Sequence, residues 1–480
     1  MPVRYHLFSV FSILATMLLR GLATPLTRRW DNMTMKHSWS AVPEHWESLG
    51  HPSAGTTIDL YLALKPHNDD ALIDALYEVS SPRHPKYVRP TPVHARMSPP
   101  VAPFRCRYGA HLSKEQVAVL IAPHPNTLQL VSSWLEDHGV PSSSVSMTLG
   151  GNWLKVIGVP VWQANDILGA SYQLYQHEET NGTVLRTVSY SLPEVMHGHI
   201  QTVVPTTYFG TSRMELKERR MRPSGVDSAR AKAGSGDNVT VLPRSAGEEL
   251  FVTPSHVRWL YNTMGYVPAA VDQNEIGIAG YRMDYPSPDD LHKFMKEFRT
   301  DGEYATFIVE PVNGGRYNPS RPGVEASINV QFAEAMTYPT PNVFYNTGGV
   351  ANTETEPYDK DPYVSWVNYL LEQSKIPQTV LTTYAGYEYD FPPEYAEKLC
   401  KMFAQLGARG VSILFGSGDW GVGEGDCLVE DEDNPGHETI EFLPMFPATC
   451  MCVFLFCLKA VHEHGDKSLT TPRFPRSVGH

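Results

Sequence analysis

The sequence predicts an α/β protein with a doubly wound, mainly parallel sheet, preceded by a smaller α+β unit. From about residue 242 onward, segments with strand periodicity alternate with segments with helix periodicity, as in a parallel sheet covered by helices. Between residues 38 and 209, strands and helices follow each other in mixed order, which is typical of an α+β layer. A chain of 480 residues is long enough for two hydrophobic cores.

A change of composition separates the two units. Residues 211–237 are rich in Arg, Lys, Ser, Gly and Ala, which predicts a solvated linker and a stretch accessible to a processing protease. We therefore expect a first unit at 38–209, a linker at 210–241 and a second unit at 242–450. The net charge of −13 argues against nucleic acid as a partner.

The N-terminus predicts secretion. Residues 1–23 contain Arg4 and His6, an apolar run from Leu7 to Leu19, and small residues at the end, as in a signal peptide. The run is shorter than the roughly 20 residues that span a bilayer, so we expect an extracellular protein without a membrane anchor. Three Asn-x-Ser/Thr triplets are candidate glycosylation sites: Asn32, Asn181 and Asn238.

The first unit is expected to contain short elements of both kinds. Asn68 or Asp69 is a candidate cap for a helix that runs through Leu76, and residues 88–107, with five prolines and no periodicity, form an atypical insert. The other expected helices are Asn126–His138 and Trp162–Leu168, and the expected strands are Thr57–Leu64, Val145–Leu149, Trp153–Ile157 and Tyr172–Gln176.

The second unit alternates strands and helices. Thr253 followed by Pro254 predicts the start of a helix through Tyr261. Further helices are expected at Ser287–Phe298, from Glu325 onward, at Pro362–Glu372 and at Pro393–Leu406, and strands at Ile276–Tyr281, Ala305–Val309, Asn342–Asn346 and Val411–Phe415.

A glycine turn after the last of these strands is the main site candidate. Glycines 416, 418, 421 and 423 surround a single acid, Asp419, and ligands of open α/β sheets bind beyond the carboxyl ends of the strands. The alternative is that Asp419 only caps a following helix or turn.

The six cysteines do not indicate a zinc site, because the sequence contains no Cys-x-x-Cys pair. In an oxidising compartment, Cys400 and Cys427 could pair across the motif strand, although spacing alone leaves the connectivity open.

A series of short motifs follows in order along both units, at residues 43–46, 76–82, 111–114, 131–135, 253–254, 260–262, 323–331, 338–341, 406–412 and 417–421. These motifs resemble the sedolisin family of serine-carboxyl peptidases, especially secreted fungal tripeptidyl-peptidase precursors. The first unit resembles the propeptide, and the similarity covers about residues 38–450. The resemblance implies a ferredoxin-like propeptide domain and a subtilisin-like catalytic domain that is incomplete here.

The resemblance also implies roles for three positions. Glu325 matches the general base that takes the proton of a nucleophilic Ser, and Asp419 matches the acid that stabilises the oxyanion. A carboxylate can serve as base in acidic conditions, where imidazole would be protonated. The family's orienting Asp, one helical turn after the base, falls on Asn329, whose amide carries no charge.

The C-terminal part departs further from the family. The nucleophile is expected in a Gly-Thr-Ser-x-Ser segment after the motif strand, followed by an aspartate-rich calcium site, and residues 451–480 resemble neither. We therefore expect no nucleophilic Ser and no metal ligands in this chain. Our hypothesis is that both 88–107 and 451–480 are translated non-coding sequence or come from a truncated gene prediction.

Three functions follow from these observations. The first is a secreted serine-type peptidase that cleaves peptides at acidic pH, by family, although these 480 residues are expected to be inactive. The second is a non-enzymatic pseudopeptidase, a glycoprotein that binds peptides. The third is a first unit that acts as chaperone and inhibitor of a peptidase.

Overall fold

The computed structural model describes residue 30 and residues 32–81, 108–148, 151–178, 181–210, 252–281, 284–348, 362–418, 428–430, 438–440 and 442–450. The predicted signal peptide, the insert 88–107, nearly all of the linker 210–241 and the tail 451–480 lie outside these ranges.

The first unit is built on a four-stranded antiparallel sheet. Its order is β4 (Val145–Met147), β5 (Trp153–Pro160), β3 (Thr57–Leu64) and β9 (Ile200–Val204). Helices α4 (Pro125–Asp137) and α5 (Val161–Leu168) contribute to the core of this unit through apolar residues that include Trp134 and Ile167. The remaining elements are β1 (Met33–Ser38), β2 (Trp46–Gly50), α2 (Ala71–Ser80), α3 (Lys114–Leu120), β6 (Gln173–His177), β7 (Thr183–Arg186) and β8 (Ser189–Pro193).

The predicted mixture of strands and helices in this unit is confirmed, with differences at the boundaries. Strand β3 has the predicted range, and Val131, Trp134 and Leu135 are buried on α4 as the spacing predicted. The predicted cap of α2 is wrong, because the cap position is Asp70, whose backbone N–H donates to Asn68 Oδ1. Asn68 therefore shapes the turn before the helix.

The second unit contains a five-stranded, entirely parallel sheet, as predicted. The strand order is β11 (Phe307–Val312), β12 (Asn342–Thr347), β10 (Ile276–Gly280), β13 (Thr379–Thr382) and β15 (Ser412–Phe415). The helices are α7 (Pro254–Leu260), α8 (Pro288–Phe298), α9 (Val324–Thr337), α10 (Pro362–Glu372) and α11 (Pro393–Ala408). Short strand pairs join β14 (Gly386–Tyr387) to β18 (Met445–Phe446), and β16 (Leu428–Glu430) to β17 (Glu438–Ile440).

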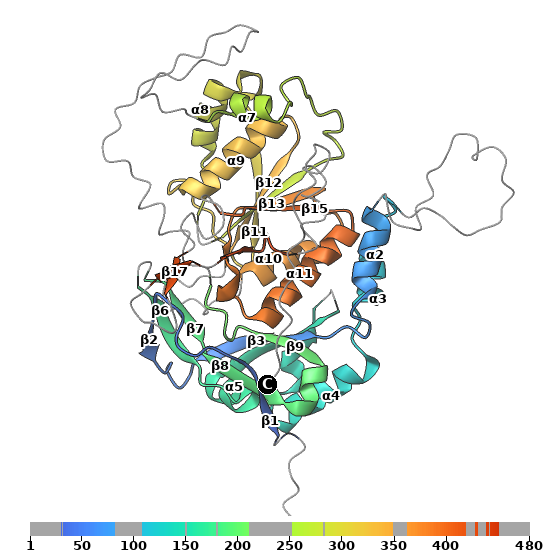
Figure 1. Ribbon diagram of the computed structural model, residues 1–480, viewed down its shortest axis with the longest axis vertical. Coiled ribbons are helices and arrows are strands. Elements are labelled where there is room, and N and C mark those ends of the chain that lie inside the picture. Colours follow the sequence, from blue (N-terminus) through green and yellow to red (C-terminus); the bar gives the residue numbers. More distant parts are fainter. Residues whose placement is uncertain are drawn as a thin grey trace, which may run out of the picture.

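Both faces of the parallel sheet are covered by helices. Because successive side chains of a strand point to opposite faces, Ile278 joins a core with α8 and α9, whereas Ala279 joins a separate core with α10 and α11. Figure 1 shows α8 and α9 on one side of the sheet, and α10 and α11 between the sheet and the first unit. The comparisons with the subtilisin and ferredoxin folds stay predictions.

Most predicted elements of the second unit are present, and α10 has the predicted range. Thr253 caps α7, and Ser287 caps α8, each by accepting a hydrogen bond from a backbone N–H of the first turn. The prediction missed β13, a strand of four residues that completes the pairing between β10 and β15.

Helix α11 is the main contact between the two units. It packs against α2 and β9 of the first unit (Figure 1). Ala404 and Ala408 of α11 lie in one apolar cluster with Leu72 and Leu76 of α2. Lys401 Nζ lies 2.7 Å from Asp69 Oδ1, so the apolar contact has a charged rim.

A buried lysine lies in this contact. Lys398 on α11 is 2% exposed, and its Nζ lies 5.0 Å from the ring centroid of Trp153 on β5. Burial, and then the neighbouring charge of Lys401, lowers the pKa of Lys398 to about 7. The aromatic face compensates only part of the desolvation cost of an ammonium group.

We predict that Lys398→Met stabilises the folded chain in acid. The folded pKa of Lys398 lies below the ordinary value of 10.5, so the cost of its charge is complete below pH 7 and disappears as the pH rises to about 10.5. This cost is on the order of a few kcal/mol. Thermal melts should show a higher Tm for the variant at pH 5 and no difference near pH 10.5, whereas the matched Lys401→Met variant, which loses an ion pair, should not gain stability in acid. Equal shifts at both pH values for Lys398→Met would contradict the prediction.

A disulfide joins α11 to the end of the described chain. Cys400 pairs with Cys450, with a Cα–Cα distance of 5.4 Å and a sequence separation of 50. The pairing of Cys400 with Cys427 that the sequence suggested is therefore wrong. The bridge fixes the segment that carries β18 against the helix that contacts the first unit.

Peptide mapping without reduction should recover a peptide pair that contains Cys400 and Cys450. The variant Cys450→Ser should lower the free energy of unfolding by about 2 to 4 kcal/mol, because closing a loop of this length restricts the unfolded chain. Recovery of Cys400 linked to Cys427 would overturn this assignment.

Candidate functional site

The carboxyl ends of three parallel strands bring several polar side chains to one edge of the sheet. Asp284 follows β10, Thr383 and Tyr384 follow β13, and the segment Gly416–Gly418 follows β15. The first turns of α9, which contain Glu325 and Asn329, meet them there through the hydrogen bonds described below. This is the edge at which open α/β sheets bind ligands.

Asp284 binds the N-terminus of α9. Its Oδ2 accepts hydrogen bonds from Ala326 N, at 2.8 Å, and from Tyr384 Oη, at 3.0 Å. Gly323, the residue before the helix, leaves space for this carboxylate, because a Cβ atom there would lie only 1.0 Å from Asp284 Oδ1. A carboxylate at this position is stabilised by the unpaired N–H groups and the positive end of the helix.

Asn329 lies one turn further along α9 and contacts the loop after β13. Its Nδ2 donates a hydrogen bond to Thr383 Oγ1 at 2.8 Å. A Cβ atom at Gly416 would lie 3.1 Å from Thr383 Cα, so only a small residue fits where the chain leaves β15. Thr383 thus contacts both α9 and the segment that leads to Asp419.

The structure brings together only some of the residues that the sequence predicted. Glu325 and Asn329 lie on the same helix four residues apart, as predicted. Asp419 lies outside the described residues, which reach Gly418 at this point. The catalytic roles of all three positions remain predictions.

Sequence reasoning missed Asp284, Thr383 and Tyr384. Asp284 follows a predicted strand by a few residues, which is the signal that singled out Asp419, and it could have been applied here as well. Thr383 and Tyr384 gave no such signal, because the strand before them was not recognised.

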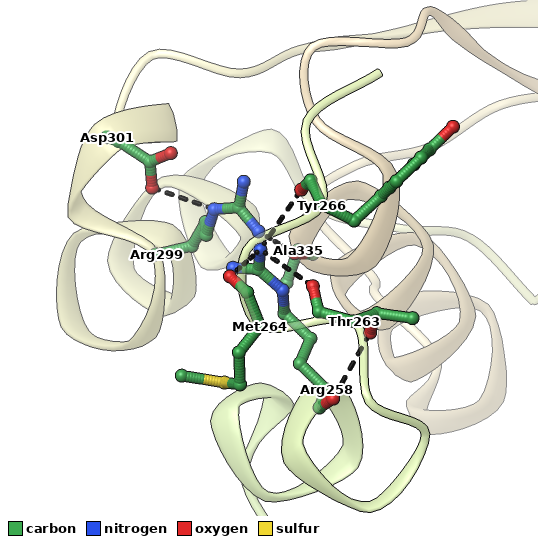
Figure 2. Close-up of polar contacts among 7 residues, drawn as sticks. All are labelled: Arg258, Thr263, Met264, Tyr266, Arg299, Asp301 and Ala335. Carbon is green, nitrogen blue, oxygen red and sulfur yellow. Dashed lines mark hydrogen bonds and ion pairs between the residues drawn. The ribbon is translucent and has the colours of Figure 1, made fainter. Parts of the chain in front are cut away.

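The other end of α9 is bound by an arginine. Arg299 is 7% exposed; its Nη1 donates to Ala335 O at 2.8 Å and its Nε lies 2.7 Å from Asp301 Oδ1. Figure 2 shows this guanidinium beside that of Arg258, which donates to the backbone carbonyls of Thr263, Met264 and Tyr266. Burial, and then the charge of Arg299, lowers the pKa of Arg258. A cation at the C-terminus of α9 complements its dipole.

A buried acid lies near the same end of α9. Glu334 is 2% exposed, and burial raises its pKa to about 8 against a smaller opposite effect of a hydrogen bond with Asn342. Glu334 Oε1 has no hydrogen-bond partner and neither has Asn342 Oδ1. A protonated Glu334 is therefore the form that suits this site at acidic and neutral pH.

We predict that Glu334→Gln stabilises the chain only at high pH. The folded pKa of Glu334 lies above its ordinary value, so its contribution to stability is complete below about pH 4.5 and is lost as the pH rises through 8. The variant should melt at a higher temperature than the unmodified chain at pH 9 and at nearly the same temperature at pH 4. Glu297→Gln, on the exposed face of α8, is the matched control and should leave the melting temperature unchanged at both pH values. A variant that melts earlier than the unmodified chain at pH 9 would contradict the prediction.

Two of the three candidate glycosylation sites are described. Asn181 is exposed, with φ of 55°, in the turn between β6 and β7. Asn32 Nδ2, the atom to which a glycan is attached, donates a hydrogen bond to Glu194. Asn238 lies outside the described residues. Both described sites are exposed, and at Asn32 the side-chain nitrogen is engaged in a hydrogen bond.

The described ranges contain no group of three or more His, Cys, Asp or Glu residues arranged to hold a metal ion. Among the same residues, no helix is long and apolar enough to cross a membrane.

Comparison with known proteins gives a consistent result. The family model described as Pro-kumamolisin, activation domain, matches residues 44–209. Tripeptidyl-peptidase SED2 of Arthroderma otae is 26% identical over 446 residues, which are 90% of this chain and 68% of that protein. Probable tripeptidyl-peptidase SED3 of Trichophyton verrucosum is 29% identical over 462 residues, which are 94% of this chain and 69% of the relative. The chain thus spans about two thirds of the length of these relatives.

Among solved structures, Pseudomonas sedolisin complexed with two molecules of pseudo-iodotyrostatin aligns with this chain at 14% identity and a TM-score of 0.29. The alignment covers 42% of this chain and 52% of the sedolisin chain. A score of this size does not indicate a shared fold.

An N-terminal activation domain, followed by a unit that aligns with peptidases over its length, defines the class: a peptidase precursor. These matches support a member of the sedolisin family, as the sequence motifs predicted.

Proposed function

We propose that this protein is the secreted precursor of a serine-type peptidase of tripeptidyl-peptidase type that cleaves peptides at acidic pH. The observation that carries this proposal is the position of Glu325 on the first turn of α9, at the carboxyl edge of a parallel sheet. The similarity to tripeptidyl-peptidases over about nine-tenths of the chain supports the substrate class. The partners are peptide substrates and the chain's own first unit, proposed as residues 38–209.

In this proposal Glu325 accepts the proton of the serine hydroxyl during attack on the scissile carbonyl. Asp419, in its protonated form, donates a hydrogen bond to the oxyanion that develops. The second step needs acidic surroundings, because Asp419 donates only while it carries a proton, whereas Glu325 must be ionised to accept one.

A second candidate is a pseudopeptidase that binds peptides without cleaving them. Asn329 favours this alternative, because the position of the orienting acid carries a neutral amide that donates to Thr383. In this alternative, peptide binding is retained and hydrolysis is lost.

The test uses the full chain at pH 4 to 5 with a fluorogenic tripeptide amide and with a phosphonate probe for serine nucleophiles. A peptidase releases the fluorophore and is labelled, and Glu325→Gln lowers the rate at least a hundredfold, since the base is lost. Glu297→Gln, an exposed acid on α8, is the matched control and should leave the rate unchanged.

Peptide binding without release or labelling would assign the chain to the second candidate. If the chain neither binds the peptide nor cleaves it, both candidate functions are wrong.

A further inference from the structure

The carboxylate of Asp284 binds the turn of α9 that contains the residue that the proposed function assigns as base. Ala326, whose N–H donates to Asp284 Oδ2 at 2.8 Å, directly follows Glu325 in the chain. Tyr384 Oη donates to the same oxygen at 3.0 Å. Asp284 and Tyr384 face this turn from other elements, whereas Glu325 and Asn329 belong to the helix itself.

These contacts favour the ionised form of Asp284. Hydrogen bonds from N–H and O–H groups stabilise a carboxylate, and the N-terminus of a helix of 14 residues adds positive potential. A negative charge next to a second carboxyl group makes that group hold its proton more tightly. A carboxylate at this turn of α9 has the sign that would increase the basicity of Glu325, which is what a base for a serine hydroxyl requires.

Asn329 does not supply this charge. Its amide is neutral, and its nitrogen donates a hydrogen bond to Thr383 Oγ1. The site thus has a carboxylate at the start of the helix and an amide one turn later, where the family pattern has a carboxylate at the second place.

We propose that Asp284 is the positioning residue for Glu325 in this chain, and that it provides the second negative charge that residue 329 lacks. This inference rests on the proposed function, because it concerns the base of that reaction. It assigns to Asp284 a role beyond holding the helix in place.

The variant Asp284→Asn separates charge from structure. An Asn oxygen can still accept from Ala326 N and Tyr384 Oη, so the turn keeps its hydrogen bonds while the charge is lost. The first measurement needs no activity: the rate at which a water-soluble carbodiimide modifies Glu325 at pH 5, followed by peptide mass spectrometry, with the exposed Glu297 as internal reference. The reagent requires the protonated carboxyl group, so we expect modification of Glu325 to fall by up to tenfold.

Two further variants complete the design. Asn329→Asp in the Asp284→Asn background returns a negative charge one turn from Glu325 and should restore most of the modification rate. Asp272→Asn removes an exposed acid elsewhere and should have no effect. A purely structural role predicts no change in Asp284→Asn and no rescue, and either result would overturn the proposal.

Hydrolysis distinguishes this proposal from the proposed function. If the unmodified chain cleaves the tripeptide amide, Asp284→Asn should lower kcat by tenfold or more with KM nearly unchanged, and an unchanged kcat would overturn the inference. If the unmodified chain cleaves nothing, the peptidase proposal fails, and the modification rate of Glu325 alone decides the role of Asp284.

Discussion

The position of α9 depends on charges of opposite sign at its two ends. Asp284 binds the amide of Ala326 at the N-terminus, and Arg299 donates to Ala335 O at the C-terminus. Each charge has the sign that the helix dipole favours at that end. Neither group belongs to the helix: Asp284 comes from the segment after β10, and Arg299 from the end of α8. The helix that carries Glu325 is therefore fixed to the sheet edge and to α8 independently.

The residue-level requirements of this arrangement are strict. Gly323 must lack a side chain because the carboxylate of Asp284 occupies the place of its Cβ atom. Gly416 is close to the backbone at Thr383, and Thr383 in turn accepts from Asn329. These close contacts align the ends of β13 and β15 with the first two turns of α9, so the candidate site is positioned by backbone packing as much as by side chains.

The sequence predicted elements whose signal is local and missed features that depend on contacts between distant residues. Helices α7 and α8 were recognisable because Thr253 and Ser287 are capping residues followed by proline. Strand β13 has four residues, too few for a period to be visible, and with it Thr383 and Tyr384 were missed. The partner of Cys400 could not be read from spacing, because a disulfide depends on the distance between Cα atoms in the fold.

Two buried ionisable groups make acidification act differently on the two parts of the chain. Glu334, beside α9, is protonated in acid without cost, so the parallel-sheet unit is favoured at low pH. Lys398, between α11 and the first unit, must be charged below pH 7 while it faces Trp153, so the contact between the units is disfavoured there. The two effects arise at different places and have opposite signs, and each results mainly from burial. The two pKa shifts therefore predict that lowering the pH weakens the attachment of the first unit relative to the stability of the unit that carries Glu325.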